Sequence, residues 1–435
     1  MLTTPSSLRW NLNPHTSLTK SLTVSGRSVP RGSKVSPGLL PVLNPTSLHH
    51  PPRRFPSLAC APVAAMLLAA GLQSAGAQQW QWYPPVNYDR GTNPKVAVVD
   101  VQGGGGGGLE VHQAVNPPLS LLPYALWARQ GDYVDGGPFS NSYQYDVGAH
   151  PTVTYAWVPG IPVPPGALQN SFEPIFIEMH QANVGVSELM CRLTDPSGTR
   201  LNAHPAIDTG EMGFNPSIAS DGVSTVVQVH QALNGTGPLW YRVGKVNRAQ
   251  TAPYAVSLSW SNPSLQYDMG ANPCVTFLED GTHVLEVHQA TAGGTAPLWY
   301  RIGTLTGTSI VWENSVLYGY GSTPSVSPTM PSGSYDDIPS GDILEVHGHA
   351  GVDTGLYYQL ASTASGPSPG SLRLNFGPAS LYGYGLTPSL AQGVGSGVPN
   401  QEGILSISNV EVHQNGNALQ TQVWGRDYLY GVMPK

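Results

Sequence analysis

The side chains with the widest chemical scope in this chain occur together in two short phrases. The first reads Glu286-Val-His288-Gln, and the second, Leu-Trp299-Tyr-Arg301, follows it after a short loop. A carboxylate, an imidazole, an indole and a guanidinium can together bind the hydroxyls and the apolar face of a sugar. Inside a protein the same groups can instead bond only to one another. The outcome depends on the elements that position them.

Both phrases recur in six copies along the chain. In three further copies the residues that we interpret as ligand-binding candidates are Glu110, His112, Trp127 and Arg129; His230, Trp240 and Arg242; and Glu411, His413, Trp424 and Arg426. The other two copies are degraded: the second has Met190 at the tryptophan position, and the fifth has Gln359 at the arginine position. We therefore expect the second site to be the weakest.

A third phrase, Tyr267-Asp-Met-Gly-Ala-Asn-Pro273, precedes each copy, and its prolines recur every 51 to 65 residues. Each unit then predicts four short strands, which is typical of a propeller blade. We expect an all-β fold in which residues 78–435 form one six-bladed β-propeller with four antiparallel strands per blade.

The two ends of this repeat region complement each other. The sixth unit stops soon after Trp424-Gly-Arg426, and the step from Trp82 to Tyr88 repeats the step from Trp312 to Tyr318. The mature N-terminal strand is therefore predicted to complete the last blade and close the ring, which removes exposed sheet edges. A linear β-solenoid is the alternative, but a solenoid needs capping ends.

Alternation along a strand places Glu286 and His288 on one face. If the two phrases form a hairpin, Glu286 lies opposite Arg301 and His288 opposite Trp299. The third unit has Gln228 in place of Glu, and the fifth has Gln359 in place of Arg, so each swap removes one charge and keeps a hydrogen-bonding group. Such swaps favour a polar contact between blades, since an unpaired buried charge is costly. Repeated sugar sites are the alternative.

A ring of six blades, each with an aromatic residue, an arginine and a glutamate, resembles the six-bladed fucose-binding lectins and related propeller lectins. The resemblance covers the architecture and residue types of residues 78–435, without a shared motif. It implies sites between adjacent blades and a carbohydrate or cell-surface glycan as partner. The function that we expect is non-catalytic recognition, without catalytic residues, metal or cofactor.

Two other functions remain open. A purely structural or protein-interaction propeller would use the repeated polar set only as core. A metal- or acid-dependent hydrolase would be centred on the fifth unit, where Glu345, His347 and His349 share one strand face and could hold zinc. Asp336, Asp337 and Asp342 also break the repeat there, and a pair of acids can cleave glycosides.

Charge and the N-terminal region predict the compartment. Residues 1–77 hold seven Lys or Arg and no acidic residue, and the remainder has a net charge of −14, which argues against nucleic acid or an anionic membrane as partner. Arg53 and Arg54 precede an apolar run and Ala75-Gly-Ala77, so residues 53–77 predict a signal peptide and a secreted (extracellular or periplasmic) protein without membrane insertion. Residues 1–52 are a disordered leader or follow a misassigned start.

Overall fold

The computed structural model describes residues 81–101, 105–115, 124–132, 141–160, 172–194, 200–249, 255–261, 263–329, 342–349, 354–366, 370–392 and 404–428. These residues form strands and one short 3-10 turn, Leu201–Ala203, with no α-helix. The predicted leader and signal peptide lie outside them. Within the same residues, no helix is long and apolar enough to span a membrane. All of them belong to one compact unit, Ala75–Lys435.

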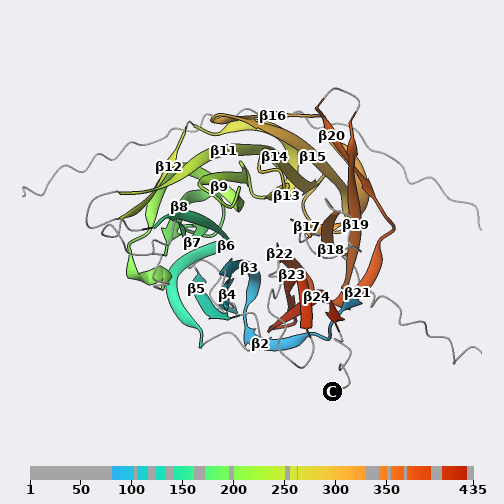
Figure 1. Cartoon of the computed structure of the whole chain (residues 1–435), viewed down its shortest axis with the longest axis horizontal. Coiled ribbons are helices and arrows are strands. Elements are labelled where there is room, and N and C mark those ends of the chain that lie inside the picture. Colours follow the sequence, from blue (N-terminus) through green and yellow to red (C-terminus); the bar gives the residue numbers. More distant parts are fainter. Residues whose placement is uncertain are drawn as a thin grey trace, which may run out of the picture. The chain divides into compact units, whose positions relative to one another are not determined.

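Strand pairing in this part of the chain is antiparallel throughout and forms six sheets (Figure 1). The first three sheets hold β3 (Thr92–Val101), β4 (Gly105–Gln113), β5 (Tyr124–Asp132) and β6 (Tyr143–Pro159); β6, β7 (Phe172–Gln181), β8 (Ser187–Leu193) and β9 (Ile207–Ser220); and β9, β10 (Thr225–Gln231), β11 (Gly237–Arg248), β12 (Val256–Trp260) and β13 (Leu265–Phe277).

The last three sheets hold β13, β14 (His283–Gln289), β15 (Ala296–Thr306), β16 (Ser309–Trp312) and β17 (Val316–Pro328); β17, β18 (Asp342–Gly348), β19 (Gly355–Ser365), β20 (Leu372–Phe376) and β21 (Ser380–Tyr384); and β22 (Leu386–Gln392), β23 (Ile404–Asn415), β24 (Ala418–Tyr428), β1 (Gln81–Trp82) and β2 (Val86–Arg90). The N-terminal strands β1 and β2 thus pair with β24, near the C-terminus. The expected all-β fold is confirmed.

Long strands pass from one sheet into the next at the Asn-Pro step of the repeat. In β13, Leu265 to Gly270 pair with β11, and Ala271 to Phe277 pair with β14. Asn272 has a φ of 51° at this junction, and the register of β13 against β14 shifts there. The equivalent residues with positive φ are Asn93, His150, Asn215, Thr323 and Thr387. Positive φ is uncommon outside glycine, and Asn and His adopt it more readily than most residues.

A glutamine of the preceding sheet holds each of four such junctions. The backbone N–H of Asn272 donates to Gln231 Oε1 at 2.7 Å, and that of Thr323 donates to Gln289 Oε1 at 2.8 Å. Gln113 and Gln181 accept from the next junction in the same way. In the first four units, the glutamine that ends the phrase therefore ties one sheet to the following strand.

The six strands that follow these junctions contact one another in cyclic order. β3, β6, β9, β13, β17 and β22 each contact the next, and β22 contacts β3 (Figure 1). Val96 and Val98 of β3 pack against Val410 and Val412 of β23, so the first and last sheets share a core. Full burial of one such side chain contributes roughly 1.5–3 kcal/mol. Among the described cysteines, Cys191 and Cys274 are both free.

Candidate functional site

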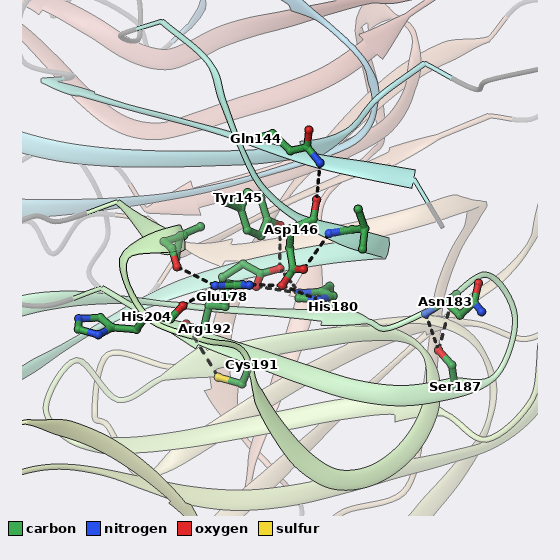
Figure 2. A network of polar contacts seen from close by, with 12 residues as sticks. Gln144, Tyr145, Asp146, Glu178, His180, Asn183, Ser187, Cys191, Arg192 and His204 are labelled. Carbon is green, nitrogen blue, oxygen red and sulfur yellow. Dashed lines mark hydrogen bonds and ion pairs between the residues drawn. The ribbon is translucent and has the colours of Figure 1, made fainter. Parts of the chain in front are cut away.

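The repeated polar residues form a chain of contacts between adjacent sheets, seen most completely in the second unit (Figure 2). Tyr145 Oη donates to Glu178 Oε1 at 2.8 Å, and His180 Nδ1 lies 3.0 Å from the same carboxylate. His180 Nε2 lies 3.4 Å from Asp146 Oδ2, to which Arg192 Nε donates at 2.5 Å. Glu178 and His180 are buried. We call this chain of Tyr, Glu, His, Asp and Arg the polar relay.

The relay joins consecutive sheets because its members come from different strands. Tyr145 and Asp146 lie in the first half of β6, which pairs with β5. Glu178 and His180 lie on β7, and Arg192 lies on β8, in the following sheet. The first unit repeats the arrangement: Tyr88 donates to Glu110 at 3.0 Å, and Arg129 donates to Asp89 at 2.6 Å. His112 Nδ1 lies 3.1 Å from Glu110 Oε2.

The predicted register of the two phrases is confirmed in five units, where Glu286 pairs across the strands with Arg301 and His288 with Trp299, or their equivalents do. The charge contact inferred from this register is wrong. Arg301 Nη1 forms its ion pair with Asp268 Oδ2 at 3.4 Å, while Glu286 bonds to His288 at 3.0 Å. The guanidinium of Arg301 is therefore paired with the aspartate of the third phrase and not with Glu286. The sequence analysis missed the role of this aspartate, although Tyr-Asp recurs in the repeat.

The expected sixth copy is also shifted. Gln422 pairs across the strands with Glu411, and Gln420 pairs with His413, so Trp424 and Arg426 are not the equivalents of Trp299 and Arg301. Gln420 Oε1 lies 2.8 Å from His413 Nε2. Trp424 is buried in a core cluster with Leu390. The side chain of Arg426 lies outside the described part of the chain.

Members of the relay are replaced together. The fifth unit has Gly319 at the Asp position and Gln359 at the Arg position, and the sixth has Gly383 and Gln422. The third unit has Gly210 at the Tyr position and Gln228 at the Glu position. Residues that contact each other therefore change as pairs, which is expected when an unpaired buried partner is costly. This pattern favours a structural role for the relay.

The histidines of the relay differ in charge according to their neighbour. Burial on its own lowers the pKa of His288, but the charge and hydrogen bond of Glu286, together with Asp268, outweigh burial and raise that pKa. The same balance raises the pKa of His112, His180 and His413. His230 lies beside the uncharged Gln228, and burial, with Arg242, lowers its pKa to about 4.

The raised pKa of His288 and the lowered pKa of His230 have opposite effects on how the stability of the fold depends on pH. A raised folded-state pKa means that protonated His288 stabilises the fold below the unfolded value near 6.5, and that this stabilisation is lost as the pH rises through the folded pKa. His230 acts in reverse, so the fold loses stability as the pH falls from about 6.5 towards about 4.

Gln228→Glu is expected to restore the carboxylate and raise the pKa of His230 from about 4 to above its ordinary value near 6.5. An NMR titration of the histidine ring protons measures this change directly. His288 provides the control, because its pKa should not change in the variant. A His230 pKa that stays near 4 would show that burial and Arg242, rather than the missing carboxylate, set its charge.

The fifth unit does not bring its candidates together. Glu345 and His347 contact each other at 2.9 Å, whereas His349 is exposed with its ring edge against Tyr357. Among the described residues no group of three His, Cys, Asp or Glu side chains could hold a metal ion. Asp342 is half-buried, and burial raises its pKa. Asp336 and Asp337 lie outside the described residues.

A pocket of ≈ 400 Å³ opens beside the relay of the first unit. Its lining includes Asp89, Arg90, His112, Trp127, Ser142 and Asn417. Trp127 is half-buried, Arg90 is exposed, and the Asp89 side chain is 18% exposed. His112, Trp127 and the relay neighbour Arg129 were candidates from the sequence. Asp89, Arg90 and Asn417 were not candidates from the sequence. Asn417 in particular comes from the far end of the chain.

Trp240 and Trp299, the equivalents of Trp127 in the third and fourth units, are also half-buried. The arginines at the next alternate position are also half-buried, with 9% of the Arg242 side chain and 14% of the Arg301 side chain accessible. The indole and the guanidinium of these units are therefore both partly accessible to a ligand. The carboxylates of Glu110, Glu286 and Glu411 are buried.

Comparison with known proteins gives only distant structural likenesses. No protein-family model and no curated protein matches the chain. Solved structures that are similar include a GH93 α-L-arabinofuranosidase of Fusarium graminearum (10% identity, 81% of this chain, 98% of that chain, TM-score 0.38) and a leech intramolecular trans-sialidase (9%, 85%, 72%, TM-score 0.37). A coronin WD40 domain from Toxoplasma gondii is a third (10%, 81%, 88%, TM-score 0.34). Similarity at this level transfers no function to the chain.

Proposed function

We propose that the six sheets are the blades of one β-propeller and that β1 and β2 complete its last blade. The cyclic contacts of β3, β6, β9, β13, β17 and β22 support this architecture. So does Trp82 of β1, which stacks on Tyr382 with ring centroids 4.4 Å apart, much as Trp312 stacks on Tyr267 at 4.9 Å. The equivalence of Trp82 and Trp312 is the one that the repeat predicts.

On this scaffold we propose that the protein recognises carbohydrate without catalysis, at the pocket of the first unit. The observation that carries the proposal is the pocket of ≈ 400 Å³ with Trp127 in its lining beside Asp89, His112 and Asn417. An indole can stack on the apolar C–H face of a sugar ring, while carboxylate, imidazole and amide groups bond its hydroxyls. The volume is within the range of small-molecule sites.

The first unit differs from the others in a way that suits a polar ligand. The residue before the junction glycine is Arg90 in the first unit, whereas exposed apolar side chains hold that position in the other five: Val147, Met212, Met269, Tyr320 and Tyr384. Arg90 is exposed and lines the pocket. A guanidinium there supplies several charged hydrogen-bond donors, whereas Val147, Met212 and Met269 supply none and each tyrosine supplies one neutral hydroxyl.

Protein interaction is the second candidate function, and that repeated apolar position favours it. Met269 is 53% exposed and Tyr320 is 61% exposed, and both precede the glycine at which a strand passes between sheets. One exposed apolar residue at the same place in successive units makes a surface suited to a protein partner.

We propose that either activity takes place outside the cytoplasm, as the N-terminal region predicts.

Glycan-array binding of residues 78–435, with Trp127→Ala and Trp299→Ala alongside, tests the carbohydrate proposal. We expect a defined glycan to bind, Trp127→Ala to weaken its binding at least about tenfold, and Trp299→Ala to leave binding intact. Equal loss in both variants would indicate repeated sites in place of one. If the folded wild-type protein binds no glycan, the carbohydrate proposal is wrong and protein interaction becomes the leading function.

A further inference from the structure

A ring of six side chains at equivalent positions surrounds the cavity between the inner strands. The cavity has a volume of ≈ 280 Å³ and is lined by β3, β6, β9, β13, β17 and β22. Each strand contributes the residue that follows its junction proline, at the same register against the middle residue of Glu-Val-His, which is Met179 in the second unit and valine in the others. These residues are Lys95, Thr152, Ser217, Cys274, Ser325 and Ser389. Five of them are small polar side chains, and the sixth is a lysine.

Lys95 places an amine in this ring, and a bound anion would favour the charged form of that amine. In the part of the chain that the structure describes, its amine forms no hydrogen bond or ion pair, whereas Arg129 and Arg301 each contact an aspartate. Burial lowers the pKa of Lys95. Burial, followed by the charge of Lys95, lowers the pKa of the neighbouring His150 to about 4, so His150 adds no second charge near neutral pH.

The hydroxyls of the ring are arranged to donate. Ser217 Oγ accepts from the backbone N–H of Val275 at 3.2 Å, and Ser325 Oγ accepts from that of Leu390 at 3.0 Å. A hydroxyl whose lone pair is occupied in this way still has its proton to give. Thr152 and Ser389 line the same cavity, and their hydroxyls have no hydrogen-bond partner among the described residues.

We propose that this ring binds a small monovalent anion, either a halide or a carboxylate group, against the Lys95 ammonium. A cation surrounded by O–H donors, with no carboxylate at its level, is complementary to an anion. Asp221 and Glu279 also line the cavity, but they lie four and five residues beyond the ring positions Ser217 and Cys274, or roughly 13 Å or more along extended strands. Their charges disfavour larger or multiply charged anions.

Line broadening of the ³⁵Cl NMR signal tests the proposal in residues 78–435, with acetate as the competing carboxylate. We expect the wild-type protein to broaden the chloride signal, Lys95→Met to weaken this binding about tenfold or more, and Lys245→Met to leave it unchanged. Lys245 is an exposed lysine and serves as the matched control. Loss of broadening on addition of acetate shows that the ring takes both anions.

The same experiment distinguishes a site for halide from a site for a carboxylate group. Broadening that acetate does not reverse identifies a halide site, and saturation transfer to acetate without chloride broadening identifies a carboxylate site. Because Lys95→Met removes a charge that lacks an internal partner, the variant is expected to fold, and its unfolding temperature without added anion checks this. Equal broadening in Lys95→Met and wild type, or binding of neither anion by wild type, would overturn the proposal.

Discussion

Gly270→Ala is expected to destabilise the protein by about 2–3 kcal/mol, the upper part of the range for overpacking in a well-packed interior. A Cβ on Gly270 would lie 2.5 Å from His288 Cδ2 and 2.6 Å from the backbone oxygen of Gln289. The histidine is held by Glu286, and the backbone oxygen belongs to a paired strand, so neither atom can move cheaply. Urea unfolding followed by tryptophan fluorescence measures the loss.

Gly107→Ala is the matched control, because a Cβ there meets only a Val99 methyl at 3.4 Å, an ordinary contact. Gly107 also lies within a strand, so its replacement tests the same change of residue without the collision. We expect the control to change the free energy of unfolding by less than about 0.5 kcal/mol. A Gly270→Ala variant as stable as the control would show that His288 does not determine the residue at 270.

The same collision occurs in the other units. A Cβ at Gly91, Gly148, Gly213, Gly321 or Gly385 would lie 2.7 Å or less from the histidine of the following Glu-Val-His phrase, or of its Gln-containing copy. The glycine and the histidine are therefore two parts of one packing rule. The strand can pass from one sheet to the next only where a glycine lies against the imidazole, because any larger side chain would collide with the ring.

The sequence alone predicted the repeat and its strands well. Periodic phrases bounded by Gly and Pro identify strands without knowledge of tertiary contacts, and the opposed positions of Glu286 and Arg301 follow from a hairpin. The pairing of β1 with β24 followed from the same repeat, since Trp82 and Trp312 have equivalent surroundings. Local spacing was sufficient for each of these predictions.

Side-chain partners were harder to predict because the relay lies between sheets. Asp268 precedes Arg301 by 33 residues, and its approach depends on how β13 passes from one sheet to the next. The contribution of Asn417 to the first pocket likewise depends on contact between distant parts of the chain. The ring around Lys95 escaped notice because its six members share a position but not a residue type.

Replacement of Asp268 by Gly and Arg301 by Gln is expected to be strongly non-additive. The pair is 21% and 14% exposed, so screening reduces its strength, and we expect each single change to cost about 2 kcal/mol. Asp268→Gly leaves a guanidinium without its carboxylate, and Arg301→Gln leaves the carboxylate without its guanidinium. The double variant reproduces Gly319 with Gln359 in the fifth unit, and no uncompensated charge remains.

We therefore expect the double variant to cost about 1 kcal/mol, less than either single change, with a coupling energy of about 3 kcal/mol. Urea unfolding of the four proteins at pH 7 and low salt gives this energy, and added salt should reduce it because the pair is partly exposed. The pair Asp280 and His283, in which the Asp280 side chain is 44% exposed and the His283 side chain 15%, provides a comparison between residues that are close in the sequence. Additive costs would mean that the Gly and Gln of the fifth and sixth units are tolerated independently, and that the relay is not a paired structural unit. Strong coupling would mean that packing between the sheets requires each unit to keep or lose its Asp and Arg together. The half-buried aromatic residue beside this pair is not bound by that requirement, so its function can differ between units.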